Sequence, residues 1–520
     1  MVIFLIPTGI LVVGILTVFL LNRFSGRSGL AWLASLIASI LSLVWAVSLY
    51  WLPERSLSLP ISDLSLEFSI HHQTVFQIIL VMSLIVFIIM TVPARIDTRR
   101  QIIVWSDMLI LALIGLFTMS ASNTWTVLVG WLALDGFEIF LSLSDRGDPE
   151  VFRQVYRGMV SRLIGIGLAI IAVGLGMGVN PSSTSESLAV LAVVFRIGIF
   201  PLQNSYLSSL SGIRLGVRVV LKAFSVLFTL PFLAGVKVLL IGNGLFTMLL
   251  IFATFSAFYN SLTWLYPREE VGAEDWECPL NVANAFLFIS AIRSHPEAMI
   301  VWASALVFVL DPFLFYSHHN RWLNALMLLN LLLLVGLPGT PFAAGWQGLV
   351  MPQLNWTDIY IIFSYVSLLS GLSLRLFGTG TRNGQVEETW MYTLVPFGYL
   401  LTFFVLILSN LMDRDFFSES GVAWAAVATL ILTGALTARL MGFFEEENLS
   451  PGKRWVPYLS HRMENFTRSL STLDWLSRPI NGVLSFFSAG MRLVNGVFEG
   501  YMGVLWEFLL LISLLLVIMR

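Results

Sequence analysis

Charged residues are scarce in this sequence. They make up 12% of the 520 residues, whereas a typical soluble domain carries about 25%. Hydrophobic residues make up 57% of the chain, and the mean hydropathy is +0.85. Because so little polar surface is available to face water, we predict that lipid solvates most of the chain.

The sequence is also poor in the residues that bind metals or form crosslinks. Cys278 is its single cysteine, which excludes an internal disulfide and a cysteine-ligated cluster. The six histidines form no spaced pair typical of a haem or metal site, so we expect no cofactor and no metal. No nucleophile constellation or phosphate-binding loop indicates catalysis within the chain. With 29 basic and 31 acidic residues, the net charge of -2 gives no electrostatic reason to expect nucleic-acid binding.

What the sequence has instead is a succession of long apolar runs. Crossing about 30 Å of hydrocarbon takes a helix of roughly 20 residues, and runs of this length predict about 14 to 16 membrane-spanning helices. They must be helices because lipid cannot satisfy open strands. The first run has no basic segment before it and no small-residue cleavage site after it, so we expect a retained helix and not a signal peptide. The candidate spans are 2–22, 30–52, 73–93, 103–121, 124–143, 159–179, 187–205, 217–236, 243–264, 281–293, 299–316, 322–338, 356–377, 391–411, 421–443 and 500–519.

The region before the last span has a different pattern. Apolar residues recur every three or four positions from Leu459 to Val494, and charged residues lie off this stripe. The pattern predicts an amphipathic helix of about forty residues that is broken at Pro479. This helix could lie on the membrane surface, or it could brace this protein or its neighbours.

Ionisable residues inside the predicted spans are the candidate functional residues. A charge at the bilayer centre costs at least about 2.5 kcal/mol, so it usually marks an ion pathway, a buried partner or a helix end. Asp135 and Glu138 share one helix face, Arg196 precedes the helix-breaking Pro201, and Lys222 follows in the next span. An acidic span followed by two basic spans is the order that a buried proton relay would need.

Each of these positions also has a structural interpretation. Asp135 and Glu138 could form an ion pair with Arg196 or Lys222. Arg196 could extend to the membrane interface, and Lys222 could end a helix. For Asp311, which precedes Pro312, we favour a helix stop near the surface.

Two motifs resemble those of the antiporter-like subunits. This family comprises the proton-pumping membrane subunits of respiratory complex I and their relatives in multisubunit sodium/proton antiporters, membrane-bound hydrogenases and inorganic-carbon transporters. Residues 195–207, FRIGIFPLQNSYL, resemble the family segment K-x-x-x-x-P-L-H-x-W-L, with Arg196 at the lysine and Gln203 at the histidine. Residues 339–349, GTPFAAGWQGL, resemble G-I-P-P-x-A-G-F-x-G-K. Lys222 matches a lysine of the family's next helix.

The chain departs from the family pattern at several charged positions. Leu349 replaces the last lysine of the second motif, and Ser304 stands where a central lysine is expected. Leu132 follows Trp131 in place of the family glutamate, and Asp135 comes one turn later. Since arginine does not release its proton at physiological pH, Arg196 could bias a neighbour but could not relay protons. These departures indicate a divergent, partly degenerate member.

The resemblance implies an all-α fold of two inverted repeats with broken helices, the breaks lying at Pro201 and at Pro338 and Pro341. The expected divisions are N-terminal helices 1–102, a first repeat 103–236, a degenerate second repeat 237–380, C-terminal helices 381–454, an amphipathic lateral helix 455–499 and a terminal span 500–520.

The resemblance also implies a function. We expect a subunit of a larger complex that contributes to proton or sodium translocation, with Asp135, Glu138, Arg196 and Lys222 as its ion-pathway residues. The alternatives are a non-pumping scaffold that anchors partner subunits, and an ion-flux subunit coupled to an inorganic-carbon or redox partner such as a complex of the NADH/quinone oxidoreductase type. The expected partners are other membrane subunits, lipid and the transported ion, in a bacterial inner membrane.

Overall fold

In the computed structural model, the described residues are 2–24, 28–52, 55–61, 64–91, 101–144, 149–177, 180–199, 215–265, 277–314, 321–340, 342–351, 355–377, 391–412 and 423–445. All of them belong to one compact unit, Met1–Trp455. The predicted amphipathic helix 455–499, its break at Pro479 and the terminal span 500–520 lie outside the described residues.

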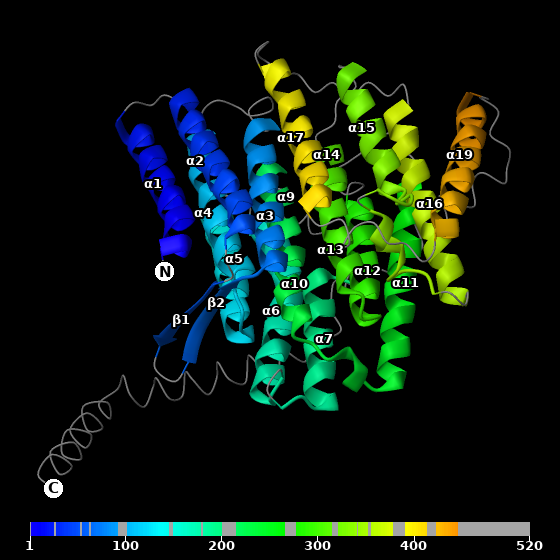
Figure 1. The fold of residues 1–520 in the computed structure, drawn as a ribbon, viewed down its shortest axis with the longest axis horizontal. Helices are drawn as coiled ribbons and strands as arrows, with labels where there is room; N and C mark the ends of the chain where they lie inside the picture. Colours follow the sequence, from blue (N-terminus) through cyan, green and yellow to red (C-terminus); the bar gives the residue numbers. More distant parts are fainter. Residues whose placement is uncertain are drawn as a thin grey trace, which may run out of the picture. The chain divides into compact units, whose positions relative to one another are not determined.

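The described chain is a bundle of helices that lie side by side (Figure 1). Seven of its segments are long and apolar enough to cross a membrane, and shorter apolar helices lie between them. This confirms the predicted all-α, polytopic fold. The helices are α1 Val2–Phe24, α2 Ser28–Ser48, α3 His72–Thr91, α4 Gln101–Met119, α5 Thr124–Ser144, α6 Pro149–Gly174, α7 Ser183–Ile197, α9 Leu215–Leu227, α10 Thr229–Ala234, α11 Asn243–Leu265, α12 Glu277–Ile292, α13 Pro296–Ala305, α14 Asp311–Leu314, α15 Arg321–Leu334, α16 Trp356–Phe377, α17 Met391–Met412 and α19 Ala423–Glu445, with short turns at η1 Leu49–Trp51, η4 Val238–Leu240, η5 Leu306–Leu310 and η6 Ala343–Trp346.

The core lies where helices are covered on every side. Helix α3 packs against α2, α4, α9 and α17, and nearly all of its side chains from Val75 to Ile89 are buried. Helix α12 is buried along its whole length, and α13 is buried from Ala298 to Ala305. A helix that is apolar all round belongs in the interior of a large bundle, and these elements enclose the charged residues described below.

A β-hairpin connects α2 to α3 outside the predicted spans. In strands β1 (Arg55–Ile61) and β2 (Leu64–Ile70) apolar residues recur at every second position from Leu57 and from Leu64, and most of the positions between them are serine, which is the two-residue period of a strand. The β2 backbone pairs with the α4–α5 loop, where the amide N of Ser69 donates to Ser120 O at 2.8 Å. The side chain of Asn123 in this loop donates to Ser65 O at 2.6 Å and accepts from the amide N of Thr126 at 2.8 Å. The hairpin therefore fixes the start of α5, the helix that carries Asp135.

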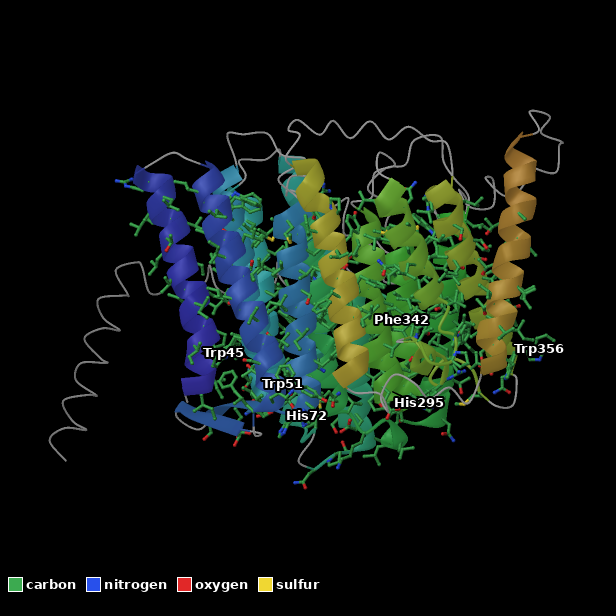
Figure 2. The ribbon with its side chains drawn as sticks, turned by 45° about the horizontal axis from the view of Figure 1, so that its top comes forward. Trp45, Trp51, His72, His295, Phe342 and Trp356 are labelled. Carbon is green, nitrogen blue, oxygen red and sulfur yellow. The ribbon has the colours of Figure 1, made fainter. Side chains whose placement is uncertain are left out.

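Aromatic residues mark the end of the bundle that carries the hairpin. Figure 2 shows Trp51, His72, His295 and Trp356 toward this end, although they lie at the ends of helices that are far apart in the sequence. Trp51 is 68% exposed and Trp356 is 80% exposed. Exposed tryptophans at one level of a helical bundle are typical of the membrane–water interface, where an amphipathic ring contacts both phases.

Two helices end at a glycine turn, and a third contains a π-helical turn. Helix α7 ends at Ile197, where Gly198 adopts a left-handed conformation with φ of 76°; Pro201 lies outside the described residues. Between α13 and α14, the residues of η5 form a wider π-helical turn. Helix α15 ends at Leu334, and the non-helical segment that follows contains Pro338, whereas Pro341 lies outside the described residues.

Gly336 is the residue that permits the turn after α15. Its φ is 72°, and a Cβ added there would lie 2.8 Å from Phe342 O and 2.9 Å from Trp346 Nε1. We expect Gly336→Ala to lower the free energy of unfolding by about 1–2 kcal/mol, because alanine is strained in the left-handed region. Thermal unfolding of the purified protein in detergent measures this loss. Gly434→Ala is the control, since a Cβ at Gly434 in α19 meets nothing within 4 Å. Equal midpoints for the two variants would contradict the prediction.

Candidate functional site

The acidic residues of α5 face an arginine of α6. Asp135 and Glu138 are one turn apart and are 3% and 1% exposed. Arg162 of α6, itself 3% exposed, places Nη1 3.1 Å from Asp135 Oδ1 and Nη2 2.6 Å from Glu138 Oε1. One guanidinium thus bridges both carboxylates, a geometry that suits the fork of arginine donors. Sequence reasoning did not select Arg162, although it lies inside a predicted span.

Arg196 of α7 binds the same carboxylate from the other side. Its Nη1 lies 3.1 Å from Asp135 Oδ2, and its Nη2 donates to Asp135 Oδ1 at 3.3 Å. The guanidinium carbon lies 4.4 Å from the centroid of the Trp131 ring, and Trp131 is held by a 2.8 Å hydrogen bond from its Nε1 to Phe228 O. Arg196 is therefore a buried partner of Asp135, and the expectation that it could extend to the membrane interface is wrong.

Lys222 lies in the middle of α9, so the interpretation of Lys222 as a helix end is also wrong. It is 5% exposed, and its Nζ donates to Asn281 Oδ1 of α12 at 3.3 Å. Asn281 Nδ2 in turn donates to Asn260 Oδ1 of α11 at 3.4 Å, and Asn260 Nδ2 donates to Ser256 O at 2.7 Å. A buried chain of polar side chains thus leads from Lys222 across α12 to α11.

The acidic groups whose charges act on Lys222 come from the second half of the chain. They are Glu277 of α12 and Asp311 of α14, whereas the charge of Arg162 acts on Lys222 from the first half. The sequence had left open whether Asp135 and Glu138 pair with Arg196 or with Lys222. The structure contains the pair of Asp135 with Arg196, together with Arg162, and Lys222 forms a second cluster on which the charge of Arg162 acts.

The expected helix stop at Asp311 is wrong. Asp311 is 1% exposed, and the helix continues through Pro312 as α14. Pro312 directly follows the π-helical turn η5, in which the amide N of Asp311 donates to Leu306 O. This wider turn interrupts the α-helical hydrogen-bond pattern at the point where proline lacks a donor, so the helix continues through it.

Two positions that carry lysines in the resembled family are apolar or neutral in this structure. Ser304 is fully buried, and its hydroxyl donates to Ile300 O at 2.8 Å within its own helix. Leu349 is also fully buried, and its carbonyl accepts a hydrogen bond from Nη1 of Arg293.

Nη2 of Arg293 lies 2.9 Å from Asp358 Oδ1. Asp358 Oδ2 also accepts from the amide N of Asn355 at 3.1 Å. This ion pair pins the loop after η6 to the end of α12, and sequence reasoning missed it because its residues lie at predicted span ends.

The arrangement can hold charge inside the bundle and can bind a proton at Lys222. Arginine stays protonated, so Arg162 and Arg196 are fixed positive charges, whereas Lys222 can lose and regain a proton. Among the described residues, no group of three or more His, Cys, Asp or Glu side chains could hold a metal ion. The fold and the site together define a polytopic membrane protein with interrupted helices and a buried network of ionisable side chains.

Solved structures of the Mrp complex and of two respiratory complexes contain chains similar in fold to this one. A chain of the Mrp complex from Dietzia sp. DQ12-45-1b aligns with 96% of this chain at 14% identity and a TM-score of 0.63; this chain spans 63% of its length. A chain of respiratory complex I from Thermus thermophilus with bound NADH aligns over 83% of this chain and 100% of its own, at 15% identity and a TM-score of 0.63. A chain of the membrane-bound sulfane sulfur reductase, an archaeal respiratory membrane complex, aligns over 100% of this chain and 99% of its own, at 12% identity and a TM-score of 0.62.

At such low identities the likeness establishes the fold alone. No protein-family model and no curated protein matches the sequence. The resemblance predicted from two short motifs and from the succession of spans is therefore confirmed in the fold.

Proposed function

We propose that this chain is an antiporter-like membrane subunit of a larger complex and that it contributes to proton translocation. The observation that carries the proposal is the position of Lys222. It is a buried lysine whose Nζ donates to Asn281, which in turn donates to Asn260. The charge of Arg162, the arginine that bridges Asp135 and Glu138, also acts on it. An ionisable residue buried in a membrane bundle marks a functional site by default, because its burial is costly.

In this proposal the two clusters have different roles. The carboxylates of Asp135 and Glu138 with Arg162 and Arg196 form a fixed charge network, since the guanidinium groups do not release protons. Lys222 is the residue that carries the proton. Its charge depends on the balance between Arg162 on one side and Glu277 and Asp311 on the other.

We expect Lys222→Ala to reduce proton flux about 100-fold, the order of the loss when a proton-transferring side chain is removed. Asp135→Asn should also reduce flux, because it removes the carboxylate that both arginines bind. The measurement uses the purified protein with the subunits that accompany it, reconstituted into liposomes with an entrapped pH-sensitive dye and a sodium-flux arm in parallel. Lys237→Ala is the matched control, since Lys237 lies exposed between α10 and η4.

Wild-type flux in both Lys222→Ala and Asp135→Asn would reject the pathway assignment. If the wild type carries sodium but not protons, and both variants lose this sodium flux, the pathway assignment stands and the transported ion is sodium.

The second candidate is a scaffold subunit, and the second half of the chain favours it. Ser304 and Leu349 carry no titratable group at the two positions where the resembled family has lysines. In addition, Arg293 donates a hydrogen bond to the carbonyl of Leu349. A scaffold predicts that Lys222→Ala leaves both assembly and the activity of the whole complex unchanged.

A further inference from the structure

Asp311 is a buried ionisable residue without a hydrogen-bond partner in the part of the chain that the structure describes. Among the described residues, neither of its carboxylate oxygens accepts a hydrogen bond, although the side chain is 1% exposed. Leaving an isolated carboxylate in such surroundings is expensive, unless a cation compensates it or a proton neutralises it. The charged group that acts on Asp311 is Lys222.

Two further buried polar side chains without partners lie on helices that pack against the turn before Asp311. Neither the oxygen nor the nitrogen of the Asn284 and Asn330 side chain amides has a hydrogen-bond partner in the described part of the chain, and both residues are almost fully buried. Asn284 lies on α12, on the helix face that carries Glu277 and Asn281, and Asn330 lies on α15. Helices α12, α14 and α15 all pack against η5, the π-helical turn that precedes Asp311. Buried polar groups that lack protein partners are usually satisfied by water.

We propose that Asp311 is a second proton-binding residue, which exchanges a proton with Lys222 through water held at the η5 turn by Asn284 and Asn330. This rests on the proposed function, and it extends the proton path from the first half of the chain into the second. The exchange conserves charge: in one state the ammonium of Lys222 compensates the carboxylate of Asp311, and in the other the proton resides on Asp311 and both groups are neutral. Both states avoid an isolated buried charge, so a proton can move between them at low cost.

The other groups that act on Lys222 set the balance between these states. Glu277 and Arg162 act on it with opposite signs, and Cys278 lies beside Glu277 on α12. The groups that adjust the charge of Lys222 therefore come from both α6 and α12.

Infrared difference spectroscopy of the full-length protein in detergent tests the proposal without any flux measurement. The wild type should show the carbonyl-stretch band of a protonated buried carboxylic acid on acidification, and Asp311→Asn should remove it. Lys222→Met should show the band already at neutral pH, because protonation is then the remaining way to neutralise Asp311. Asp358→Asn is the control, because Asp358 is equally buried but bound by Arg293 and a backbone amide, and this variant should keep the band.

A band that persists in Asp311→Asn, or one that is the same in Lys222→Met and the wild type, overturns the proposal. If Asp311→Asn does not accumulate, the Lys222→Met spectrum decides alone. The flux assay separates this inference from the proposed function. Loss of flux in Lys222→Ala together with wild-type flux in Asp311→Asn rejects only the inference, whereas wild-type flux in Lys222→Ala with a normal Asp311 band rejects only the proposed function.

Discussion

Replacing Arg162 by leucine should lower the free energy of unfolding by about 3–5 kcal/mol, the usual cost of breaking a buried ion pair by removing one partner. The guanidinium of Arg162 is the link between Asp135 and Glu138, and all three side chains are almost fully buried. Leucine fills part of the space but leaves Glu138 without the positive charge that now lies 2.6 Å from it. The thermal unfolding midpoint of the purified protein in detergent measures the loss.

Two comparisons show whether the loss comes from the buried charge. Arg23→Leu removes an exposed arginine at the end of α1, and its effect should stay within about 0.5 kcal/mol. Adding Glu138→Gln to Arg162→Leu should restore part of the stability, since a neutral amide costs less to bury than a carboxylate. An Arg162→Leu midpoint equal to that of Arg23→Leu would show that the bridge does not stabilise the fold.

Replacing Arg293 by leucine should cost a similar amount, about 3–5 kcal/mol. Arg293 binds the Leu349 carbonyl and the Asp358 carboxylate at once, so it ties the end of α12 to the loop after η6 and to the start of α16. Arg293→Lys should recover part of the loss, because an ammonium keeps the charge but lacks the fork that reaches both oxygens. The same unfolding measurement applies. A lysine variant as stable as the wild type would contradict the role of the fork, and a lysine variant no more stable than the leucine variant would contradict the contribution of the charge.

Arg293 also provides a contrast with Lys222. If the proton path uses Lys222, Arg293→Leu should lower stability while the flux per folded molecule is retained, and Lys222→Ala should lower flux with a smaller change in stability. Flux normalised to the folded fraction distinguishes the two. A loss of normalised flux in Arg293→Leu would indicate that the pinned loop takes part in translocation.

The fold was largely predictable from local features. Apolar runs the length of the bilayer predicted helices because lipid leaves no alternative for the backbone, and the motif around Arg196 predicted the fold that the solved structures share. The hairpin of β1 and β2 was not predicted. Its strands alternate leucine with serine, but a two-stranded element outside the spans gave a weak signal beside the long apolar runs.

The candidate site was predictable only in its parts. Asp135, Glu138, Arg196 and Lys222 stand out in the sequence because a charge within an apolar run is rare. The sequence offered both Arg196 and Lys222 as partners of the carboxylates but could not choose between them, since the spacing of residues along one helix says nothing about which neighbouring helix faces them. For the same reason Asp311 resembled a helix stop, although its position on α14 buries it near Lys222.

The sequence by itself determined that this is a many-helix membrane protein with a few ionisable residues inside its spans. Whether an apolar segment is solvated by lipid depends on the composition of that segment and not on which helices it contacts. Only the tertiary structure decided which charges compensate one another. It paired the acidic residues of α5 with two arginines, and it placed Lys222 among Asn281, Glu277 and Asp311. The physical reason is that interactions between buried charges act over a few ångströms, and only the packing of helices distant in the sequence brings these side chains within that range.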